Sequence, residues 1–162
     1  MSAERLDASS FGFDSRCFVC DDANPRGLRV PFFHDANAGL VFADFELPVE
    51  FSGAPTLVHG GVTLALIDEA MSWATIALSE RFAYTQHLDV DFQWPVRLGR
   101  PYRVEARIAA LDERRIMTEA TVMDSKGRVC VTASAKMAVL DLGQASEAIG
   151  TDVTGADRKF VR

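Results

Sequence analysis

The stretch TLVHGGVTLALIDEAMSWA, residues 56–74, decides the fold of this chain. It places the triplet His-Gly-Gly, residues 59–61, directly before a long apolar run that carries two adjacent carboxylates, Asp68 and Glu69. No proline interrupts the run, so the pattern predicts one helix over about 60–80. Glycine is a poor helix former and a buried carboxylate is costly, so two local rules are broken close together. Such violations mark places where function overrides folding.

The segments on either side of this helix have the pattern of β-strands. After the helix the hydrophobic period changes from 3.6 to 2, which predicts four strands separated by turns at 97–101, 111–115 and 124–127. Before it, 27–33 and 39–47 predict two more strands. Alternation with short connections is typical of an antiparallel sheet with one face on the core. The sequence therefore predicts an α+β fold in which one long helix lies across a six-stranded antiparallel sheet.

Length and composition are those of one ordinary globular domain. The 162 residues are 48% hydrophobic and carry a net charge of −6, which argues against a nucleic-acid-binding surface. There is no apolar segment typical of a secretory signal, and the run 62–78 is taken as too short and too polar to span a membrane. Three cysteines without such a signal favour a reducing, cytoplasmic compartment. We expect a lead-in over 1–16, the domain over 17–141, and a partly flexible C-terminal extension over 142–162.

The start of the helix offers backbone chemistry. A helix N-terminus leaves N–H groups without partners and carries partial positive charge, and glycines let a ligand approach that backbone closely. Gly60 and Gly61 therefore fit an oxyanion hole, although the same pair would also serve a tight turn into the helix. His59 fits either a hydrogen bond that orients the loop or a proton transfer.

Asp68 lies seven residues after Gly61, on nearly the same helix face but about 10 Å along the axis. One chain cannot bring both groups to the same reacting carbon. Two antiparallel copies of the helix about a two-fold axis would place Gly61 of one subunit against Asp68 of the other, so we predict an active site that needs a dimer. Glu69 is turned about 100° away and is the weaker candidate. The alternative for Asp68 is a solvated or hydrogen-bonded structural carboxylate.

Three separated motifs carry a resemblance to a known family. The triplet 59–61, with Asp68 nine residues after its histidine, resembles the motif of the HGG-type hotdog-fold acyl-CoA thioesterases, and within them that of the phenylacetic-acid-pathway group. CFVCDDANPRGLRV, residues 17–30, is similar to an opening found in some members, and LDVDFQWPVRLG, residues 88–99, is similar to a family strand. The resemblance covers roughly residues 17–140 and implies a hotdog fold, with the sheet wrapped around one central helix.

The resemblance also implies a reaction and its residues. The N–H of Gly61 would polarise a thioester carbonyl while His59 shapes the loop, and Asp68 from the partner subunit would act as general base or nucleophile. Thr85 matches a Ser or Thr that helps to hold the attacking water. Strict alternation puts Thr85 on the polar face of its strand, so it needs a bulge or a strand end to reach the site.

We further expect Gly60 and Glu69 to bind the substrate, an acyl-CoA or related acyl thioester, without any metal or redox cofactor. A homodimer or a dimer of dimers is expected, because a single hotdog domain exposes its helix and sheet edge. Gly53 is a departure, since some relatives have Asn six residues before the HGG histidine. Cys17 and Cys20 suggest zinc, but there is no second CxxC pair, which favours packed thiols.

Two other functions stay open at this point. One is a hotdog hydratase or dehydratase that acts on hydroxyacyl thioesters. The other is a module that binds acyl-CoA esters without turnover.

Overall fold

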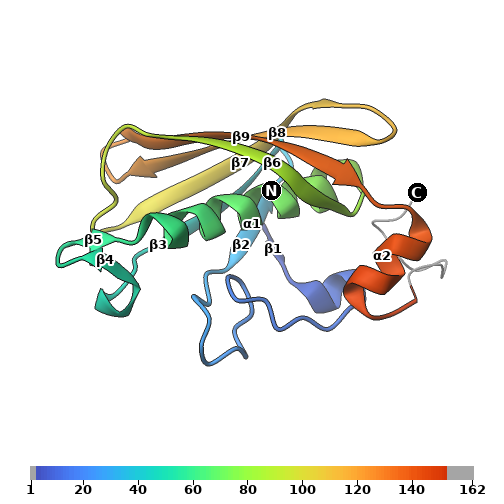
Figure 1. Cartoon of the computed structure of the whole chain (residues 1–162), viewed down its shortest axis with the longest axis horizontal. Helices are drawn as coiled ribbons and strands as arrows, with labels where there is room; N and C mark the ends of the chain where they lie inside the picture. The colour runs from blue at the N-terminus through green and yellow to red at the C-terminus, as the bar shows by residue number, and fades with distance from the viewer. Residues whose placement is uncertain (1–2, 153–162) are drawn as a thin grey trace.

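The structure, a computed structural model, describes residues 3–152. Its main feature is a seven-stranded antiparallel sheet that curves around one long helix, α1 (Gly60–Ser79), as Figure 1 shows. The strand order across the sheet is β1-β2-β3-β7-β8-β9-β6. These strands are β1 (Glu4–Leu6), β2 (Phe32–Asp35), β3 (Leu40–Phe45), β6 (Ala83–Phe92), β7 (Tyr102–Leu111), β8 (Arg115–Asp124) and β9 (Val129–Val139). The predicted α+β fold is confirmed, with one strand more in the sheet than expected.

The region before β2 differs from the prediction. The pattern predicts a strand over 27–33, whereas β2 begins only at Phe32. The N–H of Leu28 instead donates to the carbonyl of Phe18 at 2.8 Å. Leu28 and Val30 are buried because the loop folds back on itself, and they do not belong to the sheet.

The seventh strand comes from the segment expected to lead into the domain. β1 pairs with β2, Leu6 at its end is buried in the core, and the short 3-10 helix η1 (Ala8–Phe11) follows. Three residues are too few to show an alternating pattern, so periodicity could not reveal this strand. Beyond β9, the helix α2 (Leu142–Ile149) begins at a capping box formed by Asp141 and Gln144. The rest of the predicted extension, 153–162, lies outside the described residues.

Helix α1 begins and ends where the sequence predicts. Its buried residues are Thr63, Leu66, Ile67, Ala70, Met71, Trp73, Ala74, Thr75 and Ile76, which occupy most of its circumference. A helix that is apolar on most sides belongs in the interior of a domain. It ends at Glu80, which adopts the left-handed conformation at φ 56° and donates its N–H to the carbonyl of Ile76, while the N–H of Arg81 donates to the carbonyl of Thr75.

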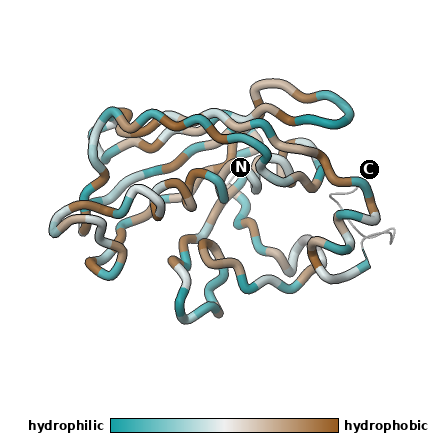
Figure 2. Tube along the Cα trace, in the orientation of Figure 1, coloured by the Kyte–Doolittle hydropathy of each residue, from teal (hydrophilic) through white to brown (hydrophobic). Residues whose placement is uncertain are grey.

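The strands β7, β8 and β9 bury alternate residues over much of their length, whereas β6 at the sheet edge is mostly exposed or half-buried. Figure 2 shows hydrophobic and hydrophilic residues alternating along the sheet. The largest fully buried side chains come from α1 and from the inner sheet face, and they include Phe32, Val41, Leu66, Ile67, Met71, Val104, Ile116, Val122, Val131 and Met137. The core therefore lies between the helix and the sheet, as two packed layers require.

The chain enters α1 through a small hairpin. The elements η2 (Val49–Phe51), β4 (Ser52–Ala54) and β5 (Leu57–Val58) precede the helix, and β4 pairs with β5. The N–H of Val58 donates to the carbonyl of Val96 at 2.9 Å, which ties the hairpin to the segment after β6. These bonds fix the position of the first helical turn.

By length and composition α1 could also cross a membrane, with a mean hydropathy of 1.3 over 18 residues. The expectation that this run is too short and too polar does not hold on those grounds. Half of the same window is buried inside the domain, which is the position of a core helix.

Candidate active site

The first turn of α1 is built around His59, the residue that caps the helix. Its Nδ1 accepts a hydrogen bond from the N–H of Gly61 at 2.9 Å. Its carbonyl accepts the N–H groups of Val62 and Thr63, at 2.9 and 3.1 Å. The N–H of His59 donates to the carbonyl of Phe51 at 2.9 Å. The imidazole therefore orients the loop, which is one of the two roles considered for it.

Gly60 presents the open donor of this turn. Within residues 3–152 its N–H has no hydrogen-bond acceptor, whereas the N–H of Gly61 is taken by His59. A Cβ on Gly60 would lie 3.8 Å from Cζ of Phe92, an ordinary contact, and the residue is exposed. An incoming carbonyl would therefore meet the N–H of Gly60 first. It would reach the N–H of Gly61 only after the imidazole turns away.

Gly53, where some relatives have Asn, packs directly against the capping histidine. A Cβ at this position would lie 2.8 Å from Cα of His59, which is closer than a real side chain can approach. The hairpin needs glycine there because the two backbones come so close. The departure from the family pattern thus has a steric cause in this chain.

Asp68 is held by Thr85 of β6. It is half-buried in the middle of α1, and Thr85 donates a hydrogen bond from Oγ1 to Oδ1 of Asp68 at 2.5 Å. The register with β9 shifts here, because Thr85 pairs with Met137 and His87 pairs with the very next residue of β9. Gln86 is the extra residue of the predicted bulge, and it turns Thr85 toward the helix.

The two halves of the candidate site stay apart within one chain. His59 joins Gly61 at the start of α1, and Thr85 joins Asp68 near its middle. Because Gly61 and Asp68 are seven residues apart on a continuous helix, about 10 Å separates them along the axis.

Glu69 turns away from Asp68 and lies in a cluster of its own. Sγ of Cys17 lies 3.3 Å from its Oε1, and the side chains of Cys20 and Trp73 also interact with its carboxyl group. Burial, followed by the negative charge at Cys17, raises the pKa of Glu69 to about 8. Glu69 therefore does not join the pair of Asp68 and Thr85, and its role in substrate binding stays a prediction.

The two cysteines of this cluster have pKa values that move in opposite directions. The hydrogen bond from the Cys20 thiol, helped by the backbone N–H groups of Val19 and Cys20, lowers the pKa of Cys17 to about 5. The same thiol hydrogen bond raises the pKa of Cys20. Sequence reasoning missed the cluster because 52 residues separate Cys17 from Glu69. The available signals were the CxxC spacing and a carboxylate in an apolar helix.

An antiparallel sheet wrapped around one central helix is the hotdog fold, and this is the class of protein that the structure defines. The fold is similar to that of RHA08564, a thioesterase superfamily protein, at 25% identity and a TM-score of 0.66, over 71% of this chain and 56% of that one. It is also similar to smu.793 of Streptococcus mutans UA159 bound to acetyl CoA, at 19% identity and a TM-score of 0.60, over 63% of this chain and 82% of that one.

Residues 56–131 match the family model of the thioesterase superfamily. The chain is also similar to acyl-coenzyme A thioesterase THEM4 of Mus musculus, at 30% identity over 111 residues. That alignment covers 60% of this chain and 47% of the mouse protein, so the chain spans about half the length of the relative it matches. The resemblance carried by the three sequence motifs is thereby confirmed at the level of the thioesterase superfamily.

Proposed function

We propose that this chain is an acyl-CoA thioesterase whose active site is shared between the two subunits of a dimer. The observation that carries the proposal is the pair of Asp68 and Thr85, a half-buried carboxylate with one oxygen fixed by a hydroxyl. The open N–H of Gly60 at the helix start supplies a complementary group for a carbonyl oxygen. Both lie on the central helix of a domain that matches thioesterases.

The proposed reaction is the hydrolysis of a thioester. Asp68 takes a proton from a water molecule as the water oxygen bonds to the carbonyl carbon. The carbonyl becomes an oxyanion held by the N–H of Gly60, and by that of Gly61 once His59 releases it. The intermediate then expels the thiolate, and the protonated Asp68 returns the proton to the leaving sulfur. Direct attack by Asp68, through an anhydride, would need the same groups.

Coenzyme A is the proposed carrier of the acyl group. The similar mouse protein is named an acyl-coenzyme A thioesterase, and the similar Streptococcus mutans protein was solved with acetyl CoA. The acyl chain that this protein prefers is a question for a substrate panel.

The proposed dimer joins two β6 strands. β6 lies at the edge of the sheet, and a ten-residue edge without a cover is a liability that proteins avoid. Thr85 near one end of β6 contacts Asp68, and Phe92 at the other end lies beside Gly60. Because Gln86 is the extra residue of the bulge, antiparallel pairing centred on Asp89 would bring Thr85 opposite Phe92 of the second copy. Each Asp68 would then lie near the helix start of the partner.

The test is release of CoA from short, long and aromatic acyl-CoAs by the wild type and by Asp68→Asn. We expect wild-type turnover and a loss of about a hundredfold or more in the variant. Glu119→Gln, a carboxylate-to-amide change on an exposed position of β8, serves as the matched control and should keep full activity. CoA should be separated by chromatography, because the three free cysteines would react with a thiol dye.

Binding without turnover across the whole panel would contradict hydrolysis and favour an acyl-CoA-binding module. Hydroxyacyl or enoyl products in place of free CoA would favour a hydratase or dehydratase. Full activity in a folded Asp68→Asn protein would remove Asp68 from the mechanism.

A further inference from the structure

Cys17, Cys20 and Glu69 form a cluster that the proposed hydrolysis does not use. One ligand atom from each residue, the two Sγ atoms and a carboxylate oxygen, lies within 4.8 Å of the others. Among residues 3–152, this is the one group of three or more metal-ligating side chains whose ligand atoms converge in this way. All three residues are partly buried, so the polar atoms face one another rather than bulk water.

The loop that carries the cysteines is built to hold its sulfur atoms in place. The backbone N–H groups of Val19 and Cys20 point at Sγ of Cys17, at 3.2 and 3.5 Å. Such N–H donors stabilise a sulfur that carries negative charge. A thiol that only fills space in a core has no need of them.

The residues that follow the cysteines brace this loop. The side-chain amide of Asn24 donates to the carbonyls of Arg16 and Cys17, at 3.1 and 3.4 Å. Gly27 passes so close to Phe18 that a Cβ would lie 2.7 Å from the Phe18 carbonyl oxygen. The segment 17–30 is therefore shaped so that both thiols are held over one point of α1.

Glu69 supplies the third atom from that point of the helix. The carboxyl group of Glu69 interacts with the thiols of Cys17 and Cys20 and with the indole of Trp73. The indole N–H can orient one carboxylate oxygen while the other faces the sulfur atoms, which is how a surrounding residue positions a metal ligand.

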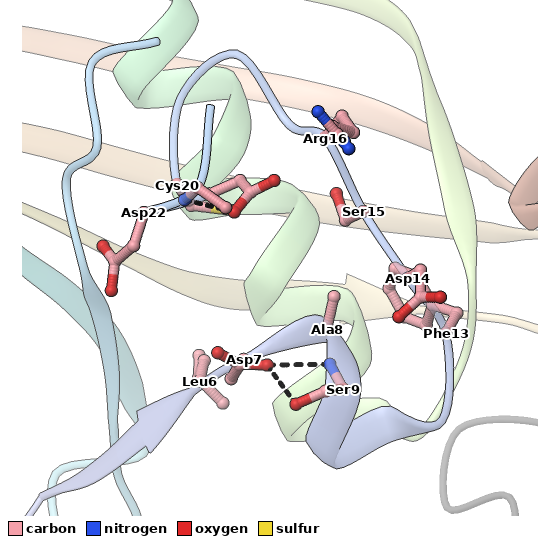
Figure 3. A pocket seen from close by; sticks show the side chains of 12 residues that line it. Leu6, Asp7, Ala8, Ser9, Phe13, Asp14, Ser15, Arg16, Cys20 and Asp22 are labelled. Atoms are coloured by element: carbon pink, nitrogen blue, oxygen red, sulfur yellow. Dashed lines mark hydrogen bonds between the residues drawn. The ribbon is translucent and has the colours of Figure 1, made fainter. Parts of the chain in front are cut away.

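The cluster has an approach from solvent. Cys20 lines a cavity of about 580 Å³ formed by the N-terminal segment, and in Figure 3 it lies toward one end of that cavity, away from Asp7 and Ser9. The cavity is also lined by Asp7, Asp14, Asp21 and Asp22 together with Arg16, and of these carboxylates Asp22 is paired with Arg5. This excess of carboxylates favours the entry of a cation.

We propose that Cys17, Cys20 and Glu69 bind one divalent transition-metal ion of the zinc class, with a water molecule as the fourth ligand. Thiolate and carboxylate ligands bond zinc at about 2.3 and 2.0–2.2 Å, which sets neighbouring ligand atoms nearly 4 Å apart in a tetrahedron. Sγ of Cys17 and Oε1 of Glu69 already lie 3.3 Å apart, and no pair of these ligand atoms has to close by more than about 1 Å to reach that arrangement. On binding, two S–metal bonds and one O–metal bond form, and the protons still held by the thiols pass to water.

The metal would link the segment 17–30 to α1 one residue from Asp68. It would fix the loop against the helix, and it takes no part in the proposed hydrolysis. The inference is therefore independent of the thioesterase proposal, and each can fail without the other.

The experiment is titration of the reduced, metal-free protein with Co²⁺, followed by absorption. We expect one equivalent to produce a sulfur-to-cobalt charge-transfer band in the near ultraviolet and the visible bands of a tetrahedral site, both abolished by Zn²⁺. Cys17→Ser and Cys20→Ser should each remove most of the charge-transfer band. Glu69→Gln should keep it but weaken Co²⁺ binding by about tenfold or more. Cys130→Ser is the matched control, because this buried thiol lies on β9, outside the cluster, and the band should be unchanged.

Several results would overturn the proposal. The absence of a cobalt band in the reduced wild type would contradict it. So would a band that survives Cys17→Ser, or one that disappears in Cys130→Ser. A Cys17–Cys20 disulfide formed with glutathione disulfide, in a protein that does not bind Co²⁺ when reduced, would make the pair a redox couple instead. If Glu69→Gln does not fold, native mass spectrometry of the wild type with Zn²⁺ decides, and absence of a 1:1 complex contradicts the site.

Discussion

The hydrogen bond from Thr85 to Asp68 engages one oxygen of the carboxylate, so the two oxygens have different roles in the proposed reaction. Oδ1 accepts from the Thr85 hydroxyl, and in the proposed hydrolysis Oδ2 would hold and activate a water molecule. A carboxylate with one oxygen fixed has fewer orientations to lose when the substrate binds. In the proposed reaction Thr85 would therefore be a positioning residue that acts through Asp68.

We expect Thr85→Ala to lower kcat by about ten- to a hundredfold, with a much smaller effect on KM, because the hydroxyl orients the base rather than binding the acyl group. Thr85→Ser keeps the hydroxyl and should retain most of the activity. Steady-state kinetics on the best acyl-CoA measure both values. If the serine variant were as impaired as the alanine variant, the methyl group and its packing would matter, and the hydrogen bond would not.

At the scale of the elements, the sequence could predict what depends on local periodicity. The ends of α1 and the alternation of β7, β8 and β9 follow from apolar spacing alone. The segment 27–33 has the same apolar spacing as a strand, but its backbone pairs with Phe18 in a tertiary loop, which no local pattern records. The sequence could not predict the contact between Cys17 and Glu69 for the same reason.

The bulge in β6 resolves a conflict between the alternation pattern of the strand and the family resemblance. Alternation places Thr85 on the polar face, whereas the family resemblance requires it at the site, and both are satisfied by one extra residue, Gln86. Deleting Gln86 should therefore leave a regular strand in which Thr85 still pairs with Met137 and still faces Asp68.

We predict that the Gln86 deletion folds and keeps activity within about tenfold of the wild type, because no side chain changes face. Deletion of Asp89, from the regular part of the same strand, is the matched control. It should turn half of the strand inside out and prevent folding or remove activity. Far-ultraviolet circular dichroism, thermal unfolding and CoA release measure the outcomes. An unfolded Gln86 deletion beside a folded Asp89 deletion would show that the bulge is not where the register shifts.

At the scale of the whole molecule, β6 forms an edge of the sheet that has no neighbouring strand on its outer side. Near and beyond its ends lie the large side chains of Tyr84, Phe92 and Trp94, which are about half exposed at 51%, 47% and 51%. Apolar side chains grouped at an open edge are typical of a surface that another copy covers. The separation of Gly61 from Asp68 along α1 gives a second, chemical reason for the same dimer.

The shared site predicts that two inactive variants restore each other. Asp68→Asn removes the base, and Gly60→Ala crowds the open N–H without a clash in its own chain, since the added Cβ is 3.8 Å from Phe92. In a mixed dimer one site then carries both changes and the other carries neither. Random mixing of equal amounts should therefore recover about a quarter of the wild-type CoA release, and the isolated mixed dimer, with one intact site of two, about half. The two variants should be coexpressed with different tags and the mixed species isolated, with each variant alone as its control. If the isolated mixed dimer is no more active than either parent, each site belongs to a single chain. The second subunit would then serve only to cover the β6 edge.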